Sequence, residues 1–283
     1  MQIADAQGHI WLASSPDREW TTAEGSSRHP RAEFGYSELL AEMDAAGVAR
    51  CVLVPPSYEG DRNDYVIEAA RSHPDRFAVQ ARLDLTRVWR RDELQSLMAD
   101  AAVKGIRLTF NGSARRRLVD GDLGWLWPMA AEQRVPVSLY PWSASAEYDS
   151  GEWAAVLRLA EMHPELVLGI DHFGVGQWVD SRTIHAALKP LRDLARMPNV
   201  SLKASSLSVI ARDSSLDPEF VSKVMRPLVE WFGPARLFWG SDRTRATVDY
   251  REEIDAFIEG LSFLTRPEVE LVMGKSLTSW LDW

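Results

Sequence analysis

The sequence predicts one domain, an α/β protein of the (β/α)8 TIM barrel class that takes in residues 1–283. Short apolar segments rich in β-branched residues alternate eight times with longer amphipathic segments, the pattern of repeated βαβ units around a parallel sheet. The length of 283 residues suits one barrel, since such barrels take roughly 250 residues. The turn after the first predicted strand, residues 5–9, has one glycine and no G-x-G-x-x-G pattern, which disfavours the rival doubly wound sheet and nucleotide binding.

The predicted strands are short and recur along the whole chain, at residues 2–7, 50–54, 77–83, 105–110, 136–140, 167–171, 200–203 and 236–240. Helices are predicted after them, at residues 36–46, 64–72, 91–101, 123–133, 152–162, 183–196, 218–232, 250–261 and 267–281. Capping and breaking residues support several of these boundaries. Asp217 precedes Pro218 at a helix start, and Gly233 precedes Pro234 just beyond a helix end.

Composition and charge are those of an ordinary soluble globular chain. Hydrophobic residues make up 46% and charged residues 26%, which allows a sizeable buried core. The 32 Lys and Arg residues against 41 Asp and Glu residues give a net charge of −9, so the overall field repels nucleic acid and anionic membranes. We therefore expect no nucleic-acid and no membrane partner, and an anionic ligand would have to be held by local Arg or Lys side chains.

The first residues and the cysteine indicate the compartment. Met1–Asp5 lacks the basic and apolar regions of a signal peptide, and no apolar run approaches the roughly 18 residues of a membrane span. Cys51 alone cannot form an internal disulfide and fits a reducing compartment. We interpret it as a core residue of the second strand rather than as a reactive thiol. The expected location is cytoplasmic.

Residues 12–34 form an unusually long connection between the first strand and the first helix. They are rich in Ser, Thr, Arg, Glu and Pro and show little periodicity. In a compact domain a loop of this length is more often a lid or a binding loop than filler, with a surface excursion as the alternative. We predict a lid or binding loop.

Polar residues gather where the predicted strands end. The C-terminal ends of barrel strands converge on one mouth, so polar side chains there are the catalytic candidates. The first strand supplies Asp5, Gln7 and His9, whose spacing of two residues predicts one shared, inward-pointing face. The later strand ends supply Arg107, Tyr140, Trp142, Asp171, His172, Lys203, Ser205, Ser241, Asp242, Arg243 and Arg245.

Each of these residues also has a structural interpretation, as a hydrogen-bonded buried group, an internal ion pair or a helix cap. Independent structural uses would not need to fall at the same edge of the barrel. Their joint occurrence therefore favours an active site. The basic run Arg115–Arg117 after the fourth strand is instead interpreted as a solvated surface feature.

Four segments of the chain carry a family resemblance. They are Asp5–Trp11 (DAQGHIW), Gly105–Arg107 (GIR), Ile170–Gly174 (IDHFG) and Phe232–Asp242 (FGPARLFWGSD), of which the last is the most specific. In order and spacing they resemble the amidohydrolase-related family across nearly the whole chain, especially its branch of sugar lactonases and 2-pyrone-4,6-dicarboxylate lactonases. The resemblance implies a hydrolase on a TIM barrel, with the eighth-strand Asp, here Asp242, as the general base.

The same resemblance bears on metal content. In metal-dependent members of the family the ligands are two His of the first strand, one His of the fifth strand and the Asp of the eighth. The matching positions here are Gln7, His9, Tyr140 and Asp242, so two of the four ligand types are missing. A stable divalent site needs at least three suitable protein ligands. We therefore expect no metal and no other cofactor, and a metal-independent lactonase rather than a zinc-dependent decarboxylase.

The expected reaction is hydrolysis of a lactone or cyclic ester, a carboxylic ester bond, with Asp242 activating water. His9 and His172 would polarise the carbonyl or position the water. The residues expected to bind substrate are Gln7, Arg107, Tyr140, Lys203, Trp142 and Arg243. Arginine and tryptophan residues near the mouth favour an anionic or aromatic small molecule as substrate, and a homodimer is compatible with barrels of this type.

Two other functions stay open at this stage. His9, His172 and Asp242 can be recruited to one divalent metal such as zinc, in a mononuclear metal-dependent hydrolase or decarboxylase. The barrel can also bind a ligand without catalysis. Metal analysis separates the first alternative from a metal-free lactonase, and the effect of Asp242→Ala on turnover separates an enzyme from a binding protein.

Overall fold

The computed structural model describes residues 1–21, 31–110, 114–140, 151–176, 179–213 and 215–283. Within these residues eight parallel strands pair in chain order. They are β1 (Ile3–Gly8), β2 (Val48–Leu53), β3 (Phe77–Leu83), β4 (Val103–Thr109), β5 (Val137–Tyr140), β6 (Leu168–Ile170), β7 (Val200–Ser205) and β8 (Leu237–Gly240). After β8 the backbone N–H of Asp242 donates to the carbonyl oxygen of Gln7 at 3.1 Å, which brings the last strand beside the first. The sheet is a nearly closed barrel, and the predicted (β/α)8 fold is confirmed.

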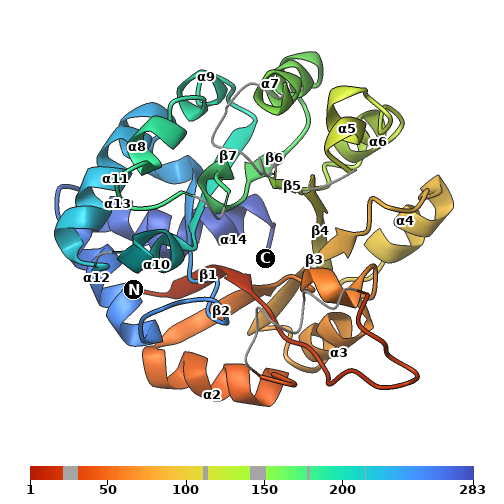
Figure 1. Ribbon diagram of the computed structural model, residues 1–283, viewed down its shortest axis with the longest axis horizontal. Coiled ribbons are helices and arrows are strands. Elements are labelled where there is room, and N and C mark those ends of the chain that lie inside the picture. The colour runs from red at the N-terminus through yellow and green to blue at the C-terminus, as the bar shows by residue number, and fades with distance from the viewer. Residues whose placement is uncertain (22–30, 111–113, 141–150, 177–178, 214) are drawn as a thin grey trace.

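Helices form the outer layer around the strands (Figure 1). They are α2 (Tyr36–Ala46), α3 (Asp64–Ser72), α4 (Arg91–Met98), α5 (Ala114–Val119), α6 (Leu126–Glu132), α7 (Glu152–Met162), α8 (Ile184–Ala187), α9 (Leu191–Leu194), α10 (Leu207–Ile210), α11 (Pro218–Phe232), α12 (Tyr250–Gly260), α13 (Arg266–Glu270) and α14 (Ser276–Trp280). On α11 one face is buried, with Val221, Val224 and Leu228 at helical spacing. Asp217 caps this helix by accepting a hydrogen bond from the backbone N–H of Phe220 at 2.8 Å.

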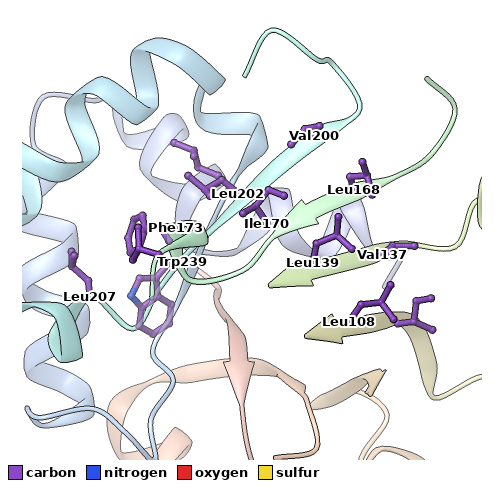
Figure 2. Packing of buried hydrophobic residues seen from close by; sticks show 14 of the residues in the cluster. Leu108, Val137, Leu139, Leu168, Ile170, Phe173, Val200, Leu202, Leu207 and Trp239 are labelled. Carbon is purple, nitrogen blue, oxygen red and sulfur yellow. The ribbon is translucent and has the colours of Figure 1, made fainter. Parts of the chain in front are cut away.

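The main core lies between the strands and the outer helices. Register places Leu108 of β4 beside Leu139 of β5. The same row continues through Ile170 on β6 and Leu202 on β7. All four side chains are fully buried, and Figure 2 shows them within the larger cluster of buried apolar residues. Burial of one such side chain stabilises the fold by about 1.5–3 kcal/mol, so this row fixes the strands against the helices.

The C-terminal segment covers the N-terminal end of the barrel. After a π-helical turn at Leu271–Lys275, α14 places Leu277 in an apolar cluster with Ala4 of β1 and Phe238 of β8. The ring of Trp280 packs on Phe238, with centroids 5.3 Å apart. In Figure 1 the C-terminus lies near the centre of the ring of strands. This end of the barrel is therefore filled by apolar side chains.

Two predicted helices are broken in the structure for local reasons. Segment 183–196 forms two short helices, α8 and α9, because Pro190 lacks the N–H that a continuous helix needs. The last predicted helix is broken by the π-helical turn, where a Cβ on Gly274 would lie 2.7 Å from the carbonyl oxygen of Gln2 on the neighbouring segment. The basic run predicted as a surface feature lies in a short helix, α5, whose residue Arg116 is exposed.

The long connection after β1 is described in part. Its two ends pair, since the backbones of Trp11 and Phe34 exchange hydrogen bonds of 2.9 and 3.0 Å. Farther along, Trp20 packs on Tyr58 with ring centroids 4.7 Å apart, which anchors the connection on the segment after β2. Residues 22–30 lie outside the described residues, so the lid or binding loop stays a prediction.

Two further observations concern the cysteine and membrane-spanning helices. Cys51 is a fully buried free thiol in β2, as predicted, and burial raises its pKa well above the usual range. In the described part of the chain, no helix has both the length and the apolar character that crossing a bilayer requires.

Candidate active site

A pocket opens at the C-terminal ends of the strands, opposite the end that α14 covers. It encloses about 840 Å³, its open mouth included, which suits a small molecule. Six polar residues form its inner surface: His9, Arg107, Tyr140, His172, Ser206 and Asp242. Arg212 and Arg245 also line it, together with apolar residues that include Val175, Val179 and Val209. Several of the predicted strand-end residues therefore do share one site.

An irregularity in β1 decides which of its side chains reach this site. The register with β2 shifts between Asp5 and Gly8, so β1 accommodates one extra residue as a β-bulge. Asp5 consequently faces the helical layer, where it accepts a hydrogen bond from the hydroxyl of Tyr250 at 2.6 Å. Gln7 and His9 face the barrel interior. The prediction that Asp5 shares their face was wrong, because strict alternation does not hold across a bulge.

Asp242 is the carboxylate of the pocket. Its Oδ1 lies 3.2 Å from Nε2 of His9, and its Oδ2 accepts a hydrogen bond from Oγ of Ser206 at 2.6 Å. The other ring nitrogen of His9, Nδ1, lies 2.6 Å from the carbonyl oxygen of Val54, which fixes the ring orientation. Burial alone would raise the pKa of Asp242, but the hydrogen bond from His9 and nearby basic groups lower this pKa well below its usual range. The group is a carboxylate at neutral pH.

His172 joins two sides of the pocket floor. Its Nδ1 lies 2.9 Å from Oγ of Ser205 and 2.8 Å from Oγ of Ser206. Its Nε2 lies 3.4 Å from Nη2 of Arg107, and because a guanidinium only donates, Nε2 is assigned as the acceptor and Nδ1 as the protonated nitrogen. Burial lowers the pKa of His172 to about 4, so the ring is neutral at pH 7. The ring of Tyr140 meets it edge-on, with centroids 5.0 Å apart.

A buried polar layer lies beneath the pocket. Nζ of Lys203 lies 3.1 Å from Oδ1 of Asp171. It also donates to the amide oxygens of Gln80 at 2.5 Å and Gln7 at 3.2 Å. Burial alone would raise the pKa of Asp171, but Lys203 and Arg107 lower it to about 2. Asp171 in turn accepts a hydrogen bond from Nε of Arg107 at 2.8 Å, so this layer fixes the guanidinium at the pocket floor.

Three pocket residues have strained backbones. His172, Ser206 and Asp242 follow β6, β7 and β8 and have φ values of 52°, 63° and 54°. This left-handed conformation costs a residue other than glycine about 1–2 kcal/mol. Residues held in such conformations cluster at functional sites, where the surrounding structure maintains them. Their recurrence at three consecutive strand ends supports an active site at this mouth.

The predicted site residues divide into groups. The pocket surface receives His9, Arg107, Tyr140, His172 and Asp242. Gln7 and Lys203 are fully buried in the layer beneath, which corrects the prediction that they contact a ligand. Arg243 turns away, because its Nε donates to a carboxylate on α2 at 2.8 Å, and Arg245 lines the pocket in its place. Trp142 lies outside the described residues.

Several site residues were not predicted from the sequence, Gln80, Ser206 and Arg212 among them. β3 places Gln80 in the buried polar layer, and the signal for it was the alternation of polar residues at 80 and 82 within an otherwise apolar strand. Ser206 was missed in favour of Ser205. The two serines are adjacent and alike in sequence, and only the left-handed turn after β7 makes Ser206 the one that reaches the pocket.

The donor groups at the mouth do not fit a divalent ion. The amide oxygen of Gln7 accepts from Lys203, and the hydroxyl of Tyr140 donates to the carbonyl oxygen of Val175 at 2.9 Å. Over the described ranges, no three His, Cys, Asp or Glu side chains are grouped closely enough to hold a metal. Protein zinc sites use at least three such ligands.

The barrel and its mouth, with a carboxylate, two imidazoles and strained strand ends, define a (β/α)8-barrel enzyme. The chain belongs to the amidohydrolase family, whose model, described as "Amidohydrolase", matches residues 4–275. The family that the four sequence segments indicated is thereby confirmed.

The following relatives share 19–28% sequence identity with this chain. An L-fucono-1,5-lactonase of Burkholderia ambifaria is 28% identical over 247 residues, which is 84% of this chain and 79% of the relative. An amidohydrolase from Burkholderia multivorans, solved with bound HEPES, superimposes with a TM-score of 0.78 at 19% identity, covering 100% of this chain and 99% of that chain. Solved with bound zinc, the same protein gives 0.77 at 20% identity, with the same coverage. A probable 2-pyrone-4,6-dicarboxylic acid hydrolase from Acinetobacter baumannii gives 0.74 at 20% identity, covering 100% of both chains. The structural matches share the fold.

Proposed function

We propose that this chain is a lactonase that hydrolyses the ester bond of a lactone or other cyclic ester without a metal ion, with Asp242 as the general base. The observation that carries the proposal is the position of Asp242, an ionised carboxylate on the pocket floor beside His9 and Ser206. The 28% identity to an L-fucono-1,5-lactonase supports the choice of a lactone over other esters.

Hydrolysis at this site requires a base for water and positive donors for the oxyanion. Asp242 takes a proton from water while the water oxygen bonds to the carbonyl carbon of the lactone. The ring C–O bond then breaks, and the departing ring oxygen takes that proton to give a hydroxy acid. Arg107 carries N–H groups that can stabilise the oxyanion, and His9, whose Nε2 lies 3.2 Å from Oδ1 of Asp242, positions the base. Because Nδ1 of His172 is engaged with serine hydroxyls, His172 acts in positioning these groups.

The pocket lining favours a substrate that has both a negative group and an apolar part. Among the described lining residues, Arg107, Arg212 and Arg245 face a single carboxylate, Asp242. Arginine binds carboxylates by paired, charge-assisted hydrogen bonds. The apolar wall that includes Val175, Val179 and Val209 suits an apolar substituent of the substrate. We therefore propose an anionic lactone with an apolar substituent rather than a neutral sugar lactone.

A panel of lactones tests the reaction and the base together. Sugar 1,5-lactones, alkyl lactones and carboxylated pyrones are assayed with the wild type, with Asp242→Asn and with Asp193→Asn, a matched change at an exposed residue of α9. The expected result is hydrolysis by the wild type and the control, and a loss of about 100-fold or more in Asp242→Asn. If the wild type hydrolyses no lactone, the proposed function is wrong.

Metal independence is tested separately. The purified protein is expected to carry well below one equivalent of zinc or manganese, and to keep its turnover after dialysis against a chelator. Stoichiometric metal whose removal abolishes turnover would contradict metal independence. It would favour the alternative in which His9, His172 and Asp242 hold one ion.

A further inference from the structure

Ser206 occupies a position that would suit glycine better. It lies between β7 and α10 with φ 63° and ψ 24°, a left-handed conformation that glycine adopts without steric cost. What serine adds at this place is the hydroxyl. That hydroxyl donates to Oδ2 of Asp242 at 2.6 Å and lies 2.8 Å from Nδ1 of His172. The backbone strain is thus maintained at a residue whose only polar side-chain group joins two groups of the pocket floor.

The hydrogen bonds through Ser206 run in one direction. Arg107 can only donate, so its Nη2 donates to Nε2 of His172 across 3.4 Å. The neutral imidazole then has its proton on Nδ1 and donates it toward the serine hydroxyls. A carboxylate can only accept, so the hydroxyl proton of Ser206 points at Asp242. The two ends of this chain of hydrogen bonds, Arg107 and Asp242, therefore fix the proton positions between them.

We propose that Ser206 is a positioning residue that orients the carboxylate of Asp242 and holds His172 in the Nδ1–H tautomer during lactone hydrolysis. This inference rests on the proposed function, in which Asp242 is the general base. With Oδ2 held by Ser206, Oδ1, which lies 3.2 Å from Nε2 of His9, is the carboxylate oxygen that takes the proton from water. Orientation of a base to within hydrogen-bond reach of its proton is what general base catalysis requires.

A pH profile can test this role, because the charged groups around Asp242 stay in place when Ser206 is changed. His9 faces Asp242 from the end of β1, His172 from the turn after β6, Arg245 from its own loop and Glu253 from α12. A substitution of Ser206 leaves all four in place. The substitution then affects Asp242 only by removing one hydrogen bond that stabilises its ionised form. The pKa of Asp242 should therefore rise.

Two variants at this position separate the hydroxyl from the backbone. Ser206→Ala removes the hydroxyl and keeps the strained Cβ, whereas Ser206→Gly removes both. We expect the same loss of kcat in each, about 10-fold to 100-fold, with KM changed by less than about threefold and the acidic limb of kcat shifted to higher pH. Because a single hydrogen bond is lost, Tm should stay within about 3 °C of the wild type.

Ser205→Ala is the matched control. Ser205 also contacts His172, at 2.9 Å, but it is fully buried and has no described hydrogen bond to Asp242. The acidic limb of this variant should stay where the wild type has it. An equal shift in Ser205→Ala would assign the effect to the general packing of His172 and would overturn the role of Ser206.

Three further results would overturn the proposed role of Ser206. A kcat within threefold of the wild type in both Ser206 variants, with Asp242-dependent turnover intact, overturns the inference and leaves the proposed function standing. An acyl adduct on Ser206, found by mass spectrometry of quenched turnover, overturns it as well, because Ser206 would then be a nucleophile. A wild type that hydrolyses no lactone overturns both proposals.

Discussion

The two ends of the barrel bury different chemistry. At the N-terminal end of the strands, α14 brings Leu277 against Ala4 and Phe238, and the cluster is apolar throughout. At the C-terminal end, His172 and Asp242 have left-handed backbones and their side chains form a hydrogen-bonded floor with Ser206. Burial of apolar side chains stabilises the first end, whereas the left-handed backbone conformations at the second end are energetically unfavourable.

The difference teaches that stability and chemistry are separated along the barrel axis. Between the two ends lies the buried polar layer of Lys203, Asp171 and Gln80, which supports the mouth from below. If the separation is real, a substitution at one end should, at neutral pH, change one property and spare the other. The following predictions test this, from the largest expected effect to the smallest.

Asp242→Asn tests the mouth. It keeps the size of the side chain and can still accept from Ser206, but the amide cannot take a proton from water. We expect kcat to fall by about 100-fold or more, roughly 2.7 kcal/mol or more in the chemical step, with little change in Tm. The measurement is steady-state kinetics on the best lactone together with a melting curve. Retention of more than about a tenth of the wild-type kcat would move the search for the base to His172.

Leu277→Ala tests the opposite end. Leu277 is fully buried in the apolar cluster of α14, so truncation leaves a cavity, and the expected loss in free energy of unfolding is about 3 kcal/mol. The kcat of the folded protein at 25 °C should be unchanged. Urea unfolding and steady-state kinetics on one preparation check both statements. A kcat that fell with stability would show that the two ends are coupled.

The pH dependence of stability should come from the mouth. His172 has a folded-state pKa of about 4, below the ordinary value of 6.5, so the unfolded chain binds its proton first as the pH falls. Stability from this residue is complete above about pH 6.5 and is lost progressively toward pH 4, by about 2 kcal/mol at pH 5. Urea unfolding at pH 7 and pH 5 measures this loss. His172→Gln should remove it, while His185→Gln, at an exposed site on α8, should not.

Arg107→Lys tests a residue that lies between the pocket and the buried polar layer. Lysine keeps the charge but cannot donate from one planar group to both Asp171 and His172. The expected result is a loss of kcat/KM of about tenfold or more, roughly 1.4 kcal/mol. An unchanged kcat/KM on the true substrate would assign Arg107 to structure alone.

Much of the fold followed from the sequence because strand and helix periods differ and proline and glycine mark boundaries. α2, α3, α7 and α11 begin and end at the predicted residues. The break at Pro190 was missed because the flanking segment remains amphipathic across it. The π-helical turn near Gly274 depends on contact with β1, which no local pattern encodes.

The candidate site was predicted less completely, for geometric reasons. Strand ends identified Asp242, His172 and His9 because convergence at the barrel mouth is a property of the fold. Whether Arg243 or Arg245 turns inward depends on the loop that follows β8. Likewise, the selection of Ser206 over Ser205 depends on one left-handed residue. Side-chain direction at a strand end is a tertiary property, and the sequence contains only its candidates.

The bulge in β1 makes the identity of the interior depend on chain length at one point. Because side chains alternate with a period of two, the extra residue places Asp5 and His9 on opposite faces although they are four residues apart. In a regular strand of the same length the two would share a face. If His9 kept its place in the pocket, the carboxylate of Asp5 would then enter the barrel and lose its bond to Tyr250. If Asp5 kept its place, His9 would leave the pocket. Deleting one residue between Asp5 and Gly8 would remove the bulge and still leave Asp5 and His9 on opposite faces, so the titratable groups of the cavity depend on whether the number of residues between these two is odd or even in the paired strand.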